Sequence, residues 1–287
     1  MNIQKYEVFV AVVDIGSLTG AAEALGLTQS GVSHIVADLE RAFGFPLLVR
    51  SRAGARPTPD GERMLPLIRQ VIEDDGRLRQ AAAAVRGLDA GVVRIATFTS
   101  VAVNWLPGMI QDFQRAYPRV EFRLLNGDYH DIDQWLTGRE ADIGFVALPC
   151  ELACDCAPLM EDRLLVILPQ GHRLAGLSGI PPSELRDEPF ISLPEDSAHD
   201  ARRALAWAGI VPQIKFTTKD DYAIIAMVER GLGVGIMPEL LLEGRGDGLV
   251  ARELDPPARR TIALAIPKGV RLGPAARRFA EHAKAWV

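Results

Sequence analysis

One stretch near the N-terminus decides the local fold: GSLTGAAEALGLTQSGVSHIVADLERAFG, residues 16–44. It contains two short helical patterns joined by the sequence LGLT. Ser17 begins the first helix, because its hydroxyl can accept a hydrogen bond from a free backbone N–H group. Gly26 supplies the backbone freedom needed just past a helix end, and Thr28 caps the second helix. Two helices joined by a tight turn with glycine form a helix-turn-helix pattern.

Each predicted helix has one apolar face and one polar face. The apolar positions are Leu18, Ala21, Ala22 and Leu25 in the first helix and Val32, Ile35, Val36 and Leu39 in the second. The outward positions of the second helix are polar and of the right size to reach base edges or phosphates. We therefore expect DNA contacts from Thr28, Gln29, Ser30, Ser33 and His34.

The sequence FPLLVRSRAGARPTPDGE comes directly after this pair of helices. Its apolar run at residues 47–49 predicts a strand. Arg50, Arg52 and Arg56 then lie on a predicted turn that contains Gly54. We interpret this segment as a wing that touches the DNA backbone, because arginine is a common phosphate contact.

Together, these motifs resemble those of the LysR-type transcriptional regulators. The resemblance rests on GSLTGAAEALGLTQSGVSHIVADLE and PLLVRSRAGARPTPDGE, and it extends over essentially the full length of the chain. It implies an all-α winged helix-turn-helix domain at residues 1–58, a linker helix at 59–87 that dimerises, and an effector-binding domain at 88–287.

The resemblance also implies the fold and the role of the C-terminal domain. The expected fold is α/β, with two Rossmann-like lobes like those of periplasmic solute-binding proteins. Lobe I would comprise residues 88–160 and 267–287, and lobe II residues 161–266, with crossings near Glu161 and Ile266. The implied function is sequence-specific, DNA-binding regulation of transcription, controlled by a small-molecule effector between the lobes.

The implied partners follow from this function. They are double-stranded DNA with a dyad-symmetric site, a small-molecule effector and further copies of the chain. We expect a homodimer through the linker helix and a dimer of dimers, which is a homotetramer, with RNA polymerase open as a further partner. We expect no cofactor, no metal and no enzymatic activity, since the sequence contains neither H-E-x-x-H nor G-x-S-x-G. An enzyme on the same two-lobed scaffold stays an alternative.

A long helix is predicted at residues 58–87. Thr58 and Pro59 are a cap and first-turn pair, and Pro66 should kink the helix. A stripe of apolar residues runs through this polar helix: Met64, Leu65, Ile68, Val71, Ile72, Leu78, Ala82 and Val85. We expect this stripe to pair with a second subunit. Packing on the C-terminal domain of the same chain is the alternative.

The composition limits the class of protein. The 287 residues carry a net charge of −5, and no long apolar run or secretory signal occurs, so we expect a cytoplasmic protein with no membrane partner. Residues 1–60 contain five Lys and Arg against six Asp and Glu. Each subunit should therefore bind DNA weakly, through wing arginines, helix N-termini and several subunits acting together.

Polar side chains after the predicted strands are candidates for the effector site, because ligands bind off the carboxyl ends of strands in open α/β sheets. Thr97, Thr99 and Ser100 offer hydroxyls on the turn at residues 97–104, which suits a carboxylate or similar small anion. Ser100 also matches the position that usually contacts the effector in the resembled family. Helix capping alone is the alternative role of these hydroxyls. Further candidates are Asn126, Asp128, Phe145, Ala147, Ser192, Pro194 and Lys219.

Three cysteines, Cys150, Cys154 and Cys156, lie near the first predicted crossing. A redox- or metal-responsive regulator using these thiols is the second alternative. No basic residue lies between them to lower a thiol pKa, so ordinary loop residues are the favoured interpretation.

Overall fold

The computed structural model describes residues 2–51, 54–85, 90–150, 152–194, 200–244 and 248–287. Two compact units make up the chain. The first comprises residues 1–88 with 138–140, and the second comprises residues 89–137 with 141–287. No helix in the described ranges is long and apolar enough to cross a membrane.

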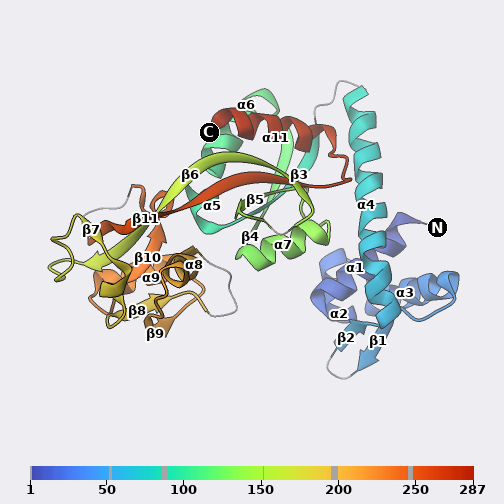
Figure 1. Cartoon of the computed structure of the whole chain (residues 1–287). Helices are drawn as coiled ribbons and strands as arrows, with labels where there is room; N and C mark the ends of the chain where they lie inside the picture. Colours follow the sequence, from blue (N-terminus) through green and yellow to red (C-terminus); the bar gives the residue numbers. More distant parts are fainter. Residues whose placement is uncertain (1, 52–53, 86–89, 151, 195–199, 245–247) are drawn as a thin grey trace. The chain divides into compact units, whose positions relative to one another are not determined.

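Three helices form the body of the first unit (Figure 1): α1 (Ile3–Ile15), α2 (Leu18–Leu25) and α3 (Gln29–Phe43). The Oγ of Ser17 accepts a hydrogen bond from Gly20 N at 3.3 Å, and the Oγ1 of Thr28 accepts one from Gly31 N at 3.1 Å. Gly26 ends α2 in the left-handed conformation with φ 65°. These contacts confirm both predicted N-caps and the predicted end of the first helix.

The core of this unit contains the residues of the predicted apolar faces, with one exception. Ala21, Val32, Val36 and Leu39 are buried together with Phe9 and Val12 from α1. Leu25 is wrongly predicted, because it lies 40% exposed at the end of α2. Leu25 is the last residue of α2 and lies directly before the C-cap Gly26, where the chain leaves the helix.

A two-stranded hairpin follows the helices, formed by β1 (Leu48–Ser51) and β2 (Gly54–Pro57), which pair antiparallel. Gly54 has φ +124°, and a Cβ there would collide with the carbonyl oxygen of Gly16. The same oxygen accepts a hydrogen bond from Ala55 N at 2.8 Å. The hairpin is thus fixed to the end of α1, as a wing requires.

The helix α4 (Pro59–Val85) completes the first unit. Gly61 N donates a 2.9 Å hydrogen bond to the Oγ1 of Thr58, which is the predicted cap. Ile68 is buried in the core of the unit, and Pro66 lies inside the helix.

The second unit is built from two lobes. Lobe I contains β3 (Ala90–Thr97), α5 (Thr99–Asn104), α6 (Leu106–Ala116), β4 (Arg119–Asn126), α7 (Tyr129–Thr137), β5 (Ile143–Leu148) and α11 (Pro274–Trp286). In this lobe β4, β3 and β5 are parallel neighbours. Helices α6 and α11 cover one face of the sheet and α7 the other (Figure 1).

Lobe II contains β7 (Gly179–Ile180), the short 3-10 helix η1 (Pro182–Leu185), β8 (Pro189–Ser192), α8 (Asp200–Trp207), β9 (Gln213–Thr217), α9 (Asp221–Glu229), β10 (Gly235–Pro238) and α10 (Glu239–Leu242). Strands β8 and β9 pair in parallel, and β10 pairs antiparallel with β6. The predicted α/β fold of two lobes is confirmed.

Two long strands, β6 (Cys154–Pro169) and β11 (Leu249–Pro267), cross between the lobes and pair antiparallel (Figure 1). An uninterrupted apolar run is missing from the lobe I half of β6, residues 154–163, and from the lobe II half of β11, residues 249–259, so neither full strand is evident from the sequence pattern. The second predicted crossing, near Ile266, is too late in the chain. Thr261 to Ala265 already pair with β5 in lobe I, so the crossing precedes them.

Candidate DNA-reading surface and ligand cleft

The exposed start of α3 presents the polar residues predicted to contact DNA. Thr28, Gln29, Ser30 and His34 are exposed, and Ser33 is half-buried. The hydroxyl of Thr28 is already used, since it accepts from Gly31 N and lies 3.2 Å from the Oγ of Ser30. Gln29 and His34 therefore offer the longer side chains of this surface.

The wing reaches the same surface. Arg50 lies on β1 and donates a 2.7 Å hydrogen bond from Nη1 to the Oγ of Ser33 on α3. Arg56 lies on β2 and is exposed. The prediction that both stand on the turn is wrong, because the strands extend into the arginine-rich segment and the turn is shorter. Arg52 falls outside the described residues.

The acidic residues of α3 are compensated by neighbouring groups. Asp38 accepts a 3.0 Å hydrogen bond from Lys5 and pairs with Arg41, and these cations hold the pKa of Asp38 below its usual value. Glu40 accepts hydrogen bonds from the backbone N–H groups of Leu47 and Leu48 at 2.8 and 3.0 Å. Asp38 and Glu40 thus contact groups of the protein itself, and Arg50 and Arg56 of the wing remain exposed.

The helix α4 keeps part of its apolar stripe uncovered. Val71 and Leu78 of the predicted stripe are 45% and 69% exposed, and Leu67, which the prediction did not include, is 55% exposed. The prediction that the whole stripe pairs with a second subunit is wrong for Ile68 and for Met64, Leu65 and Ile72, because these residues pack in the core of the first unit itself. Apolar side chains in a row on a polar helix are typical of a face that pairs with another helix.

A cavity of about 310 Å³ lies between the two lobes of the second unit. Lobe I contributes α5 and the start of α7, and lobe II contributes β8, α8 and α9. Six of the predicted effector residues line it: Thr99, Ser100, Asn126, Asp128, Ser192 and Lys219. They meet because the carboxyl ends of β3, β4 and β8 face one another across the cleft.

Four predicted effector residues do not line the cavity. Thr97 is fully buried in β3 and donates its hydroxyl to the carbonyl of Phe98. Phe145 packs edge-on against Trp105 in the lobe I core. Ala147, two residues further along β5, is also buried, and Pro194 is half-buried outside the lining. Proximity to a strand end does not decide on which face of the sheet a side chain lies.

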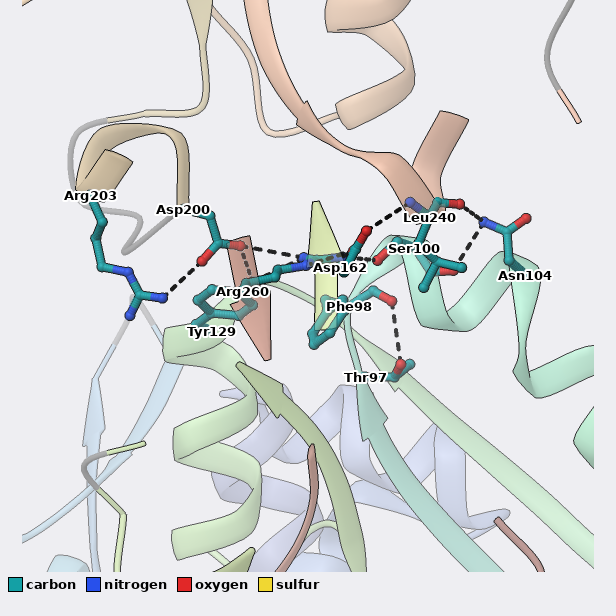
Figure 2. Close-up of polar contacts among 10 residues, drawn as sticks. All are labelled: Thr97, Phe98, Ser100, Asn104, Tyr129, Asp162, Asp200, Arg203, Leu240 and Arg260. Carbon is teal, nitrogen blue, oxygen red and sulfur yellow. Dashed lines mark hydrogen bonds and ion pairs between the residues drawn. The ribbon is translucent and has the colours of Figure 1, made fainter. Parts of the chain in front are cut away.

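The base of the cavity contains a buried arginine, Arg260, whose guanidinium lies at the centre of a polar network (Figure 2). Its Nε and Nη2 donate to Asp162 at 2.9 and 2.6 Å, and Nη2 also donates to the Oγ of Ser100 at 2.7 Å. Its Nη1 lies 3.1 Å from the hydroxyl of Tyr129 and 3.4 Å from Asp200. A guanidinium has five N–H donors, so these five contacts use its capacity.

The network joins the two lobes. Tyr129, on α7 of lobe I, donates a 2.6 Å hydrogen bond to Asp200, on α8 of lobe II (Figure 2). Burial raises the pKa of the Tyr129 phenol, so the hydroxyl keeps the proton that it donates. Asp200 also accepts from Arg203 at 2.9 Å.

The network also holds α5 against α10. Asp162 accepts from the backbone N–H of Leu240 at 3.0 Å, and the side chain of Asn104 donates to the Leu240 carbonyl at 2.6 Å. Ser100 keeps its own O–H as a donor, because its oxygen accepts from Arg260.

Sequence reasoning missed the residues of this network and one further carboxylate of the lining: Asp162, Tyr129, Asp200, Arg260 and Asp221. One signal existed, since Arg260 directly precedes the apolar run TIALAI, where an uncompensated charge would be costly. Burial raises the pKa of Asp221, while a hydrogen bond from Thr99 and the charge of Arg260 lower it.

Two of the three cysteines lie on a strand where burial raises the pKa of their thiols. Cys154 and Cys156 lie on β6 and not in a loop as predicted. Burial, followed by the neighbouring Cys150, raises the pKa of Cys154 to about 12 and also raises that of Cys156. Such thiols stay protonated at neutral pH and react slowly. Among the described residues no group of three or more His, Cys, Asp or Glu side chains could hold a metal ion.

Comparison with protein families gives two matches. The family described as "Bacterial regulatory helix-turn-helix protein, lysR family" matches residues 3–62. The family described as "LysR substrate binding domain" matches residues 86–287. The two matches correspond to the unit that carries the wing and to the unit that carries the cavity.

Individual relatives cover almost the whole chain. The HTH-type transcriptional regulator YvbU of Bacillus subtilis is 32% identical over 99% of this chain and 98% of its own length. The transcriptional activator protein LysR of Escherichia coli is 28% identical over 93% and 88%. Among solved structures, a full-length OxyR variant from Pseudomonas aeruginosa has a TM-score of 0.75 at 23% identity, covering 100% of this chain and 99% of that one. HinK from the same organism has a TM-score of 0.59 at 28% identity, with coverages of 99% and 98%.

Proposed function

The chain belongs to the LysR family of DNA-binding transcriptional regulators, and we propose that a small molecule bound between the two lobes controls the affinity of this chain for DNA. One observation carries the proposal: a cavity of about 310 Å³ whose walls come from both lobes. A ligand in such a cavity contacts both lobes at once, so it favours one lobe arrangement over another. The coupling that this requires is typically about 1–3 kcal/mol.

The DNA contacts in this proposal come from the start of α3 and from the wing. Gln29 and His34 would reach base edges, while Arg50 and Arg56 would lie on the phosphates. The hydrogen bond between Arg50 and Ser33 fixes the wing against the helix, which supports a joint contact.

A DNA-binding titration tests the function. Fluorescence anisotropy would compare the DNA flanking the chain's own gene with a scrambled duplex of the same length, at rising salt. We expect tighter binding to the flanking DNA and a loss of affinity at higher salt. Equal affinity for both duplexes at every salt concentration would contradict sequence-specific regulation.

The same proposal includes a homodimer through α4 and a dimer of dimers on dyad-symmetric DNA, with RNA polymerase as a further contact and no cofactor besides the effector. The exposed row of Leu67, Val71 and Leu78 supports the α4 pairing. Analytical ultracentrifugation of Leu67→Glu with Leu78→Glu would test it. Val49→Glu is the matched control, because Val49 on the wing is also 55% exposed. A double variant that sediments like the wild type would remove α4 from the interface.

A further inference from the structure

The lining of the cavity between the lobes carries more negative charge than a site that binds a carboxylate ligand should have. Among the described residues of this lining, four carboxylates, from Asp128, Asp131, Asp200 and Asp221, stand against the two cations Lys219 and Arg260. Lys219 is exposed and therefore well solvated. The charge balance of the lining thus favours a cation over an anion.

The buried cation of this cavity has no capacity left for an anionic ligand. The five N–H donors of Arg260 meet acceptors of Asp162, Ser100, Tyr129 and Asp200. An incoming carboxylate would have to displace one of these groups. Displacing Asp200 would leave a second negative charge buried beside the ligand.

One of the hydroxyls predicted to bind an anion, that of Thr99, already faces a carboxylate of the protein. Thr99 hydrogen bonds to Asp221, which α9 of lobe II brings opposite α5 of lobe I. The N-cap of α5, Phe98, makes no side-chain cap, and the helix is only six residues long. An anion would therefore meet the charge of Asp221 at the place where hydroxyls and amides were expected to receive it.

Asp221 is the least compensated carboxylate of the lining. Asp200 pairs with Arg203 and Arg260, at 2.9 and 3.4 Å. Asp128 and Asp131 accept hydrogen bonds from each other's backbone N–H groups at the start of α7. For Asp221, burial outweighs the hydrogen bond from Thr99 and the charge of Arg260, and its pKa is raised.

The apolar part of the lining comes from both lobes. It includes Phe98, Leu164, Phe190, Ile236, Met237 and Leu241. An apolar body fits against these walls, because burying it there removes its surface from water.

We propose that the effector is an organic ammonium compound, with a protonated amino group on Asp221 and an apolar body against these walls. The inference rests on the proposed function, and it specifies the ligand class of that site. Two kinds of compound carry this chemistry: a simple amine, and an amino acid whose carboxylate extends to Lys219 at the exposed rim.

Four probes with the same phenyl ring separate the possibilities, each added to the full-length protein: 2-phenylethylamine, phenylalanine, 3-phenylpropanoate and 2-phenylethanol. Thermal shift and calorimetric titration would measure binding at up to about 10 mM probe, since a ligand raises stability by mass action. We expect the amine and the amino acid to bind more tightly than the propanoate and the alcohol. Phenylalanine above phenylethylamine would indicate the contribution of Lys219.

Asp221→Asn tests the contact itself. We expect about ten- to a hundredfold weaker binding of phenylethylamine, because a charge-assisted hydrogen bond is lost. Asp220→Asn is the matched control: it removes the same charge one residue earlier, outside the cavity lining, and asparagine also caps helices well. Asp221→Glu should retain the preference for the amines.

Three results would overturn the inference: equal or tighter binding of the propanoate, an unchanged amine affinity in Asp221→Asn, or no shift with any probe. The function has a separate readout, which is DNA affinity with and without each probe. If the propanoate binds and changes DNA affinity, the cleft is an effector site for a different ligand class. If amines bind through Asp221 and DNA affinity never changes, the ligand class stands and effector control fails.

Discussion

Replacing Arg260 by methionine should strongly destabilise the second unit, because it leaves a buried carboxylate without its cation. The side chain of Asp162 is 1% exposed and that of Arg260 is 4% exposed, with 2.6 Å between the Nη2 of Arg260 and Asp162. Removing one partner of a buried ion pair costs about 3–5 kcal/mol, most of it from the uncompensated charge. Methionine keeps much of the length of arginine, so the cavity left behind is small.

The next residue along β11 provides the control. Arg259 is 50% exposed, and its nearest carboxylate, on Glu161, lies 3.9 Å away. Surface substitutions of this kind usually change stability by less than about 0.5 kcal/mol. Arg259→Met therefore removes the same charge from the same strand without touching the network.

Tryptophan fluorescence makes the measurement specific to the second unit within the intact chain. All four tryptophans, Trp105, Trp135, Trp207 and Trp286, lie in that unit. Urea unfolding followed at this signal reports on the lobes and not on the winged unit. A loss of about 3–5 kcal/mol corresponds to a midpoint shift of about 1–3 M urea at ordinary m-values.

A double variant separates the orphaned charge from lost packing. Asp162→Asn combined with Arg260→Met removes both charges and keeps an oxygen that can accept from Leu240 N. We expect it to be more stable than Arg260→Met alone by about 1–2 kcal/mol. A double variant less stable than the single one would refute the reasoning, as would a loss below about 1 kcal/mol for Arg260→Met.

Three further predictions concern the two sites. Tyr129→Phe removes the hydroxyl that spans the cleft and should lower probe affinity by about a factor of 2–10 with little change in DNA affinity, measured by calorimetry and anisotropy. Arg50→Ala should weaken binding to all duplexes and flatten the salt dependence by about one phosphate contact, and an unaltered salt slope would place the wing off the backbone. Burial raises the pKa of Asp221 and Asp220 raises it further, while Arg260 lowers it. The affinity for amines should therefore fall as the pH drops through that raised pKa, because the carboxyl group then takes up a proton and loses its charge. Calorimetry between pH 4 and 8 measures this dependence, and a pH-independent affinity would show that Asp221 is not the contact.

The sequence was most informative where structure depends on near neighbours. The caps at Ser17 and Thr28 each require only an N–H group three residues away, so the residue type and the spacing determine them. Gly26 follows the same logic, since a left-handed residue ends a helix wherever it stands. The helix-turn-helix could therefore be predicted from about thirty residues.

The network around Arg260 lay beyond such reasoning, because its members come from distant parts of the chain. Arg260 is 160 residues from Ser100 and 98 from Asp162, and the crossing of β6 and β11 brings them together. The wrong predictions at Phe145 and Ala147 have a related cause. A strand can be predicted from its apolar residues, but the face that meets the cleft depends on how the sheet is covered.

The same argument explains why the expected ligand class changed. Thr99 and Ser100 carry the chemistry of an anion site when they are considered with their own strand and helix alone. In the folded chain the Ser100 oxygen accepts from Arg260, and the Thr99 hydroxyl hydrogen bonds to Asp221, so both side chains already contact charged groups of the protein. A binding motif on one lobe therefore accounts for only part of the charges that line the cavity. The carboxylate that lobe II contributes opposite it decides which sign of ligand the cleft accepts.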